Sequence, residues 1–194
     1  MKHTSTRNLY AYWDERRGHR ATPDRADIDP TAIPRVLGDT FLLGGDTPDE
    51  PVFRLAGTRV CALFCRELRG EAFFALFSRT GRQAIRNLFA VVTDEAVGSV
   101  AGLTGRIADR SEVELELLLL PLRHRGRTNT RILGVLAPIG APYWLGVHPV
   151  TDIELGTIRH IGPLVESIEP APLPIPLHAG RMRHGLVVYD GGRS

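Results

Sequence analysis

The chain has 194 residues, of which 43% are hydrophobic and 24% are charged, and its formal net charge is +2. This length predicts one domain with extensions, and this composition excludes an intrinsically disordered chain. The longest apolar stretch, residues 115–122, is shorter than the roughly 20 residues that cross a bilayer, and residues 1–8 lack the apolar segment of a signal peptide. We therefore expect a cytoplasmic protein that does not enter the membrane, and the near balance of charges disfavours a nucleic-acid binder.

An amphipathic helix is predicted over residues 4–18. Three consecutive hydroxyl side chains can cap its N-terminus, and Gly18 ends it. Leu9, Tyr12 and Trp13 fall on one face of this helix and form an apolar stripe. The stripe predicts one of two arrangements, a contact in a homodimer or packing of the helix against the protein's own sheet.

A β-hairpin and a long helix follow. Short apolar strands over residues 40–43 and 52–56 flank a turn rich in Gly, Asp and Pro. Short helical pieces are expected over residues 57–77. The helix over residues 80–97 is the clearest in the chain, because apolar side chains recur along one face at helical spacing.

Three strands are predicted next, over residues 99–108, 112–122 and 131–139. In the second of them, Glu112, Glu114 and Glu116 alternate with apolar residues. Because successive side chains of a strand point to opposite faces, this pattern predicts one buried face and one solvent face. The glutamates have no metal-ligating or aromatic neighbours in the sequence, so we interpret them as a solvent face rather than as catalytic carboxylates. Residues 153–161 are expected to be one more extended segment.

The order of these elements predicts an α+β fold, a five-stranded antiparallel sheet with helices on one face. Residues 1–38 are expected to form an N-terminal helix and connector, and residues 39–162 the core. Residues 163–194 are expected to be a proline-rich linker and a tail, because four prolines lie between positions 170 and 176. The tail contains a β-prone run that ends in Tyr189-Asp190-Gly191-Gly192.

The region from residue 57 to residue 77 carries a likeness to a known family. The run from Leu55 to Gly70 resembles the PAS signature, in which a small residue and a Leu-Phe pair precede Glu-Leu-x-Gly and an aromatic residue. Over nearly all of residues 8–194, the chain is similar to the single-domain PAS family of alphaproteobacteria. The matching segments are Trp13 with Arg16 and Arg17, Ala26–Pro30 with Ile33 and Pro34, Arg54–Thr58, Arg66–Gly70, and Leu186–Gly192. The resemblance implies a PAS fold and a stand-alone, non-catalytic bacterial signalling module.

The resemblance also implies a ligand cavity between the sheet and the helices. Its lining would be Phe53, Val60, Phe64, Phe74, Phe77, Ile85, Leu88 and Phe89. The alternative is that these large side chains fill the core completely, which such residues do more often than they line an open pocket.

Haem and flavin are both disfavoured as cofactors of such a cavity. Haem in PAS domains is generally held by a histidine on the long helix, and residues 80–97 contain none. The run from Cys65 to Gly70 partly matches the photoactive Asn-Cys-Arg-Phe-Leu-Gln-Gly motif of LOV domains, but Phe64 and Arg69 replace its Asn and Gln. We therefore interpret Cys65 as a small buried residue. The histidine spacing predicts no zinc site.

Arginines between residues 54 and 69 raise one alternative. Arg59 and Arg66 are seven residues apart and share a face if the segment is helical, and Arg69 follows them. Such a cluster fits the phosphates of a cyclic dinucleotide, although a solvated face paired with acidic residues is the commoner meaning of a charge run. No nucleophile elbow, Walker A loop or dinucleotide fingerprint is present, so we predict no enzyme. We predict a signalling module that senses a small ligand, docks a protein, or does both.

Overall fold

The computed structural model describes residues 1–45, 50–109, 111–124, 127–140, 142–161, 181–183 and 186–188; in 127–130, 181–183 and 186–188 only the backbone is described. The chain divides into two compact units, Met1–Pro163 and Leu164–Ser194. The second unit contains a small antiparallel pair, β7 (Arg181–Arg183) with β8 (Leu186–Val188). The predicted linker and the terminal Tyr189–Gly192 lie outside the described residues.

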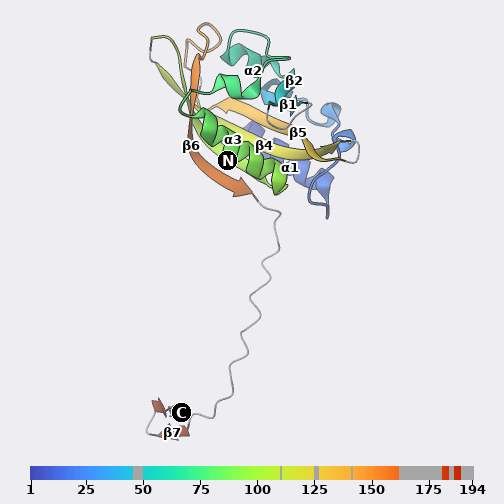
Figure 1. Ribbon diagram of the computed structural model, residues 1–194, viewed down its shortest axis with the longest axis vertical. Helices are drawn as coiled ribbons and strands as arrows, with labels where there is room; N and C mark the ends of the chain where they lie inside the picture. The colour runs from blue at the N-terminus through green and yellow to red at the C-terminus, as the bar shows by residue number, and fades with distance from the viewer. Residues whose placement is uncertain are drawn as a thin grey trace. The chain divides into compact units, whose positions relative to one another are not determined.

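A six-stranded antiparallel sheet forms the centre of the first unit (Figure 1). Its strands are β1 (Thr40–Gly44), β2 (Val52–Ala56), β3 (Gly98–Arg106), β4 (Glu112–His124), β5 (Arg127–Pro138) and β6 (Asp152–Ile161). They lie side by side in the order β2-β1-β5-β4-β3-β6. The α+β class and the predicted hairpin are confirmed.

The sheet has one strand more than predicted, because β6 pairs along β3. The pairing shifts register between Ala101 and Leu103. A bulge of this kind interrupts the alternation of side chains between the two faces, so β6 lacks the clear two-residue pattern of β4.

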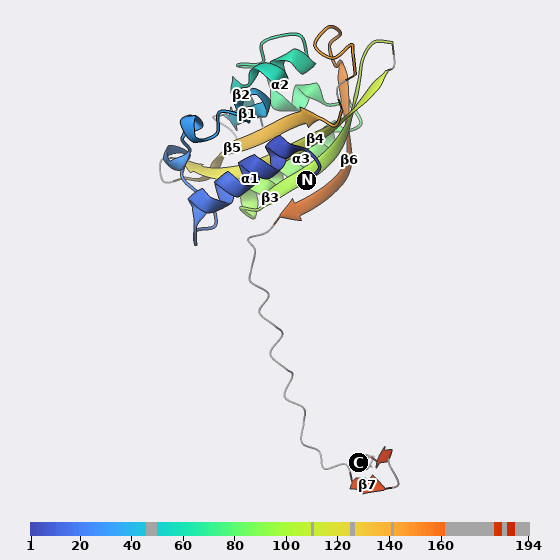
Figure 2. The same cartoon turned by 180° about the vertical axis from the view of Figure 1, so that it is seen from behind.

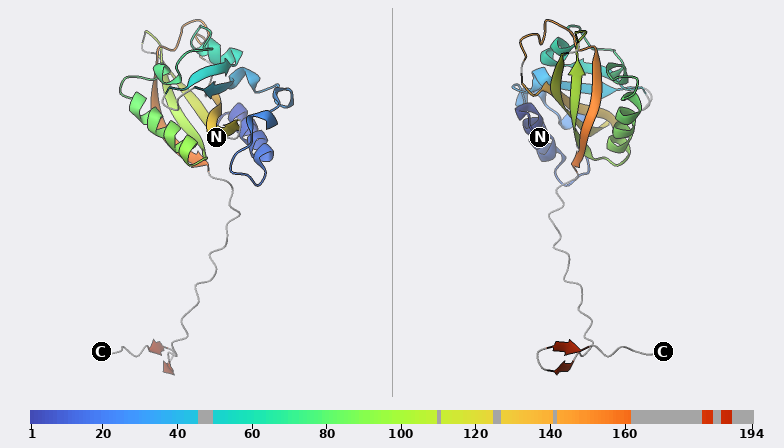
Figure 3. Two further views of the ribbon diagram at one scale, coloured as in Figure 1. Left: turned by 45° about the vertical axis from the view of Figure 1, so that its right-hand side comes forward. Right: turned by 90° about the vertical axis from the view of Figure 1, so that its left-hand side faces the viewer.

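Helices lie on both faces of the sheet: those of the core share one face, as predicted, and the predicted N-terminal helix lies on the other. On the inner face lie α2 (Thr58–Leu63), the 3-10 helix η4 (Phe73–Leu76) and α3 (Arg82–Asp94). On the outer face lies α1 (Thr4–Arg17). Figure 3 shows the sheet between α3 and α1.

The helix α1 has the predicted extent and a different cap. His3 is its N-cap, and the Nδ1 atom of His3 accepts a hydrogen bond from the Ser5 backbone N–H at 3.2 Å. Gly18 follows the last helical residue with φ +55°, a conformation that favours glycine. The Trp13 indole donates to the Pro121 carbonyl at 3.0 Å and so attaches the helix to β4.

Three short 3-10 helices connect α1 to the sheet: η1 (Arg25–Asp27), η2 (Pro30–Ala32) and η3 (Leu37–Asp39). The Asp29 backbone N–H donates to the Tyr12 hydroxyl at 2.8 Å, which ties this connector to α1. The connector is therefore packed with α1, and it leads directly into β1.

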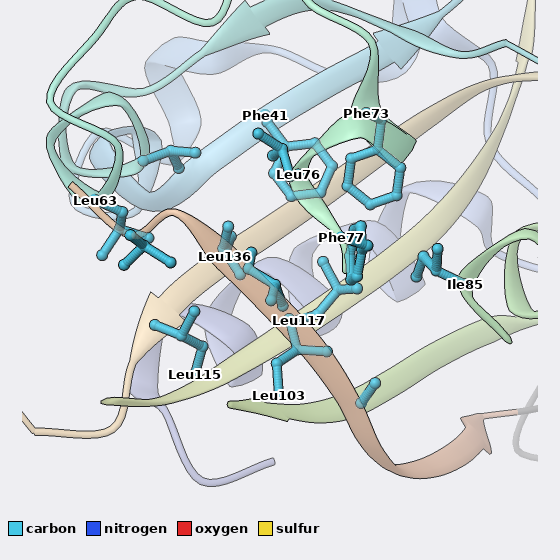
Figure 4. Packing of buried hydrophobic residues seen from close by; sticks show 14 of the residues in the cluster. Phe41, Leu63, Phe73, Leu76, Phe77, Ile85, Leu103, Leu115, Leu117 and Leu136 are labelled. Atoms are coloured by element: carbon cyan, nitrogen blue, oxygen red, sulfur yellow. The ribbon is translucent and has the colours of Figure 1, made fainter. Parts of the chain in front are cut away.

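The sheet separates two hydrophobic clusters. The inner cluster contains every phenylalanine of the chain and Trp144, and the outer cluster contains Trp13. Side chains of β4 alternate between them, with Leu117 inside and Leu118 outside. Figure 4 shows the inner cluster, where Phe41, Phe73 and residues of the central strands converge. Within the described residues, no helix has the length and apolar character needed to cross a bilayer.

Candidate functional site

The eight residues predicted to line a cavity all lie in the inner cluster, and none is more than 7% exposed. Phe73, which that prediction left out, lies among them. Its ring centroid is 5.4–5.8 Å from those of Phe41, Phe53, Phe74 and Phe77. These separations are typical of packed aromatic pairs. The lining of an open cavity by these eight residues stays a prediction, and so does the alternative of a filled core.

The segment that resembles the LOV motif lies at the surface. The helix α2 ends at Leu63, and Cys65 adopts φ +50°. Cys65 is exposed and its thiol donates to the Ala62 carbonyl, so the interpretation of Cys65 as a buried residue is wrong. The segment turns away from the helix here, which directs this side chain outward instead of toward the inner cluster.

The three arginines of the predicted phosphate site are not arranged on one helix face, because α2 ends before Arg66. Arg59 forms two hydrogen bonds with Asp39, from Nε at 2.7 Å and from Nη2 at 2.8 Å. Arg66 lies 3.7 Å from Glu71. Arg69 is exposed. Two of the three guanidinium groups are thus already opposite carboxylates of the same chain.

The stripe of α1 is buried against the protein's own sheet. Leu9, Tyr12 and Trp13 are at most 7% exposed and belong to the outer cluster with Leu118 and Leu120 of β4. Of the two arrangements expected for this stripe, the structure has the second. A dimer contact through these three side chains would require α1 to leave the sheet.

The glutamates of β4 do not all face solvent. Glu116 is only 5% exposed, and its carboxylate accepts the backbone N–H groups of Lys2 at 2.6 Å and His3 at 2.9 Å. Burial alone raises the pKa of Glu116, but these hydrogen bonds outweigh burial and the pKa lies below its ordinary value. The solvent-face prediction is therefore wrong for Glu116, because the segment before α1 covers that position.

A half-open groove of about 480 Å³ lies on the outer face of the sheet, beside the start of α1. We call it the outer groove. Figure 2 shows this face, with the N-terminus close to β3 and β6. The groove is lined by Met1, Lys2, Val100, Gly102, Leu103, Thr104, Glu114, Leu115, Glu116, Ile139, Gly156, Thr157, Ile158 and Arg159.

Two glycines of the groove lining lie where β3 and β6 approach each other closely. A Cβ atom at Gly156 would lie 2.9 Å from the Gly102 carbonyl oxygen, and one at Gly102 would lie 3.0 Å from the Thr157 hydroxyl. The strands β3 and β6 approach closely here because neither glycine has a side chain. Gly102 also lies where the pairing of β3 with β6 shifts register, so the groove lining includes the bulge.

A buried carboxylate joins three elements near the first strand. Asp39 is the last residue of η3 and its side chain is 3% exposed. Besides the two bonds from Arg59, it accepts the Ser5 hydroxyl of α1 at 2.6 Å. Burial raises the pKa of Asp39, but the bonds from Arg59 and Ser5 more than compensate and hold it below its ordinary value. The sequence predictions missed Asp39, since a lone Asp before a strand has no distinguishing pattern.

The strand order and the helical crossover from β2 to β3 define an α+β module built on one antiparallel sheet. A family model described as a PAS domain matches residues 1–137, so the chain belongs to the PAS domain family. PAS domains are sensory modules of signal transduction and are generally non-catalytic. The PAS resemblance and the PAS-like fold are confirmed.

The solved structures that are similar to this chain share little sequence with it. The LOV protein of Rhodobacter sphaeroides is 16% identical with a TM-score of 0.42, over 60% of this chain and 71% of that chain. The blue-light photoreceptor Aureochrome1 LOV in its dark structure is 15% identical with a TM-score of 0.44, over 58% and 83%. The PAS domain of an HTR-like protein from Haloarcula marismortui is 16% identical with a TM-score of 0.41, over 56% and 91%. No curated protein matches the chain.

Proposed function

We propose that this PAS domain is a non-catalytic signalling module that docks a partner protein in the outer groove. The observation that carries the proposal is the contrast between the two faces of the sheet. On the inner face, phenylalanine rings are packed against one another where a PAS ligand would lie. On the outer face, α1 covers the central strands and a groove of about 480 Å³ lies over β3 and β6.

The chemistry of the outer groove suits a protein surface. Ile158, which is 44% exposed, contributes apolar area to the lining. Lys2, Glu114 and Arg159 place charges of both signs in the same lining. Apolar and charged side chains occur together in protein–protein interfaces.

Two other ligands have less support. A small molecule in the inner cluster would have to displace rings such as Phe73, which is 1% exposed. A cyclic dinucleotide held by Arg59, Arg66 and Arg69 would compete with the carboxylate of Asp39. That carboxylate already accepts two charge-assisted hydrogen bonds from the Arg59 guanidinium.

Site-specific photocrosslinking in cells tests the docking proposal. A photoreactive residue at Thr157 lies in the groove lining, and one at Gln83, an exposed position of α3, is the matched control. We expect a discrete protein adduct from Thr157 and none from Gln83. Combining Gly102→Val with the photoreactive residue at position 157 should abolish the adduct. A Cβ atom at position 102 would meet only the tip of the side chain at position 157, and the added side chain would fill the floor of the outer groove.

The proposal fails if the Thr157 and Gln83 positions give the same adducts, or if Gly102→Val changes nothing while circular dichroism shows that the variant is folded. Native mass spectrometry of the purified chain tests the small-ligand alternative in parallel. A mass above that of the 21.4 kDa chain, retained without denaturation, would favour a bound ligand.

A further inference from the structure

Asp39 lies between two helices on opposite faces of the sheet. Its carboxylate accepts the Ser5 hydroxyl from α1, on the outer face, and the Arg59 guanidinium from α2, on the inner face. All three hydrogen bonds are 2.6–2.8 Å long, as charge-assisted bonds are. Ser5 and Arg59 thus act on the same acceptor, although each belongs to a different layer.

The joint between Asp39 and α2 has little room for independent movement. A Cβ at Gly57, the N-cap of α2, would lie 2.1 Å from the Leu37 carbonyl oxygen. A Cβ at Gly38 would lie 2.7 Å from the guanidinium carbon of Arg59. Both glycines therefore allow η3 and α2 to contact each other through backbone and guanidinium, and a displacement of α2 carries η3 with it.

The joint between Asp39 and α1 is equally short. Ser5 lies in the first turn of α1 and is 6% exposed. The segment immediately before it is held by the second buried carboxylate, Glu116, through the backbone N–H groups of Lys2 and His3. The start of α1 is thus held by two carboxylates, Glu116 of β4 and Asp39 of η3, and Asp39 is the one shared with α2.

We propose that Asp39 couples α2 to α1, so that release of Arg59 from Asp39 loosens the first turn of α1 on the opposite face of the sheet. The coupling lies beyond the docking function and does not depend on it. A carboxylate that is 3% exposed cannot remain unchanged when its cation leaves; it must take up water or a proton. Either response alters the acceptor of the Ser5 hydroxyl. The Arg59 side chain is 56% exposed, so it is accessible from solvent on the side away from Asp39.

Hydrogen–deuterium exchange of the full chain tests this coupling. The variant is Arg59→Met, which keeps the length of the side chain and removes its charge. The control is Arg66→Met, because Arg66 is 52% exposed and forms its ion pair with Glu71, at 3.7 Å. We expect the amides of residues 7–10 to exchange about tenfold faster in Arg59→Met, the factor that corresponds to one charge-assisted hydrogen bond. Amides of α3 and all amides of Arg66→Met should keep the wild-type rates.

A second comparison separates coupling from general destabilisation. In an Asp39→Asn background the shared carboxylate is absent, so Arg59→Met should add no further acceleration to residues 7–10. Equal acceleration in α1 and α3 would overturn the proposal, since it indicates global opening. The proposal is also overturned if residues 7–10 keep their wild-type rates in Arg59→Met, or if Arg59→Met accelerates them as much in the Asp39→Asn background as in the wild type.

Discussion

Two carboxylates determine how the N-terminal segment is attached to the domain, and both are buried. As whole residues, Asp39 and Glu116 are 2% and 5% exposed. Asp39 accepts the Ser5 hydroxyl, and Glu116 accepts the Lys2 backbone N–H. An ionised group in such a place is stabilising only while its donors remain. The stability that these two carboxylates contribute therefore depends on the position of α1, which supplies or adjoins their donors.

Glu116→Gln should lower the free energy of unfolding at pH 7 by about 1–2 kcal/mol, because the amide keeps the shape but not the charge that accepts two backbone N–H groups. The pKa of Glu116 is lowered by folding, so its contribution is present above the unfolded pKa and is lost as the pH falls through the folded pKa. The difference between wild type and variant should therefore shrink as the pH falls below about 4.

Urea unfolding of both proteins at several pH values measures this difference. The control is Glu114→Gln on the same strand, whose side chain is 69% exposed and should change stability by less than about 0.5 kcal/mol. A Glu116→Gln difference that stays constant across the acid range would contradict the assignment of the charge to these bonds.

At the scale of elements, α1 acts as part of the core rather than as an appendage. Its apolar stripe covers the outer side chains of β4 and β5, and its indole is hydrogen bonded to the backbone of β4. Most of the stability of a 14-residue helix comes from such tertiary packing, since isolated helices of this length are marginal in water.

Leu9→Ala should destabilise the domain by about 2–5 kcal/mol, because Leu9 is fully buried and its removal leaves a cavity between α1 and the sheet. Leu55→Ala is the matched control; it makes the same chemical change at a side chain that is 53% exposed. Thermal unfolding monitored by circular dichroism compares the two. Similar melting temperatures for both variants would mean that α1 does not contribute to the cooperative unit.

The positions of the elements and the α+β sheet could be predicted from the sequence, while the layer to which α1 belongs could not. The stripe of α1 predicted a buried face and left open whether it met its own sheet or a second copy. The alternation of Glu116 with apolar residues predicted a solvent face because a strand pattern does not reveal which later layer covers it. Leu118, two residues farther along the same face, is fully buried for the same reason.

The candidate site was less predictable than the fold. The outer groove depends on Gly102 and Gly156, which come together only when β6 pairs with β3. The coupling residue Asp39 depends on Ser5 and Arg59, which are 34 and 20 residues away in the chain. Spacing in a sequence predicts contacts within a helix or strand, whereas these sites arise from contacts between elements.

At the scale of the whole molecule, the chain has a PAS fold, and phenylalanine rings are packed against one another on the inner face of its sheet. Phe73 lies among the rings that fill it, 1% exposed and within 6.4 Å of Phe89 between ring centroids. We expect these packed rings to leave no space for small apolar molecules, which should therefore not stabilise the native chain.

Phe73→Ala tests this statement. We expect it to cost about 3–5 kcal/mol and to create an apolar cavity. Because such cavities stay dry and accept small apolar molecules, benzene should raise the melting temperature of Phe73→Ala and leave that of the wild type unchanged. Thermal shift with and without benzene measures both. Stabilisation of the wild type would show that a cavity already exists beside Phe73.

The division of the core by the sheet has a practical consequence for spectroscopy. The chain has two tryptophans, and the sheet separates them: Trp13 lies in the outer cluster and Trp144 in the inner cluster, both at most 7% exposed. Indole fluorescence responds to local solvation, so Trp13→Phe and Trp144→Phe each leave one emitter in one layer. The fluorescence of these two variants distinguishes a structural change on one face of the sheet from a change on the other, without any external label.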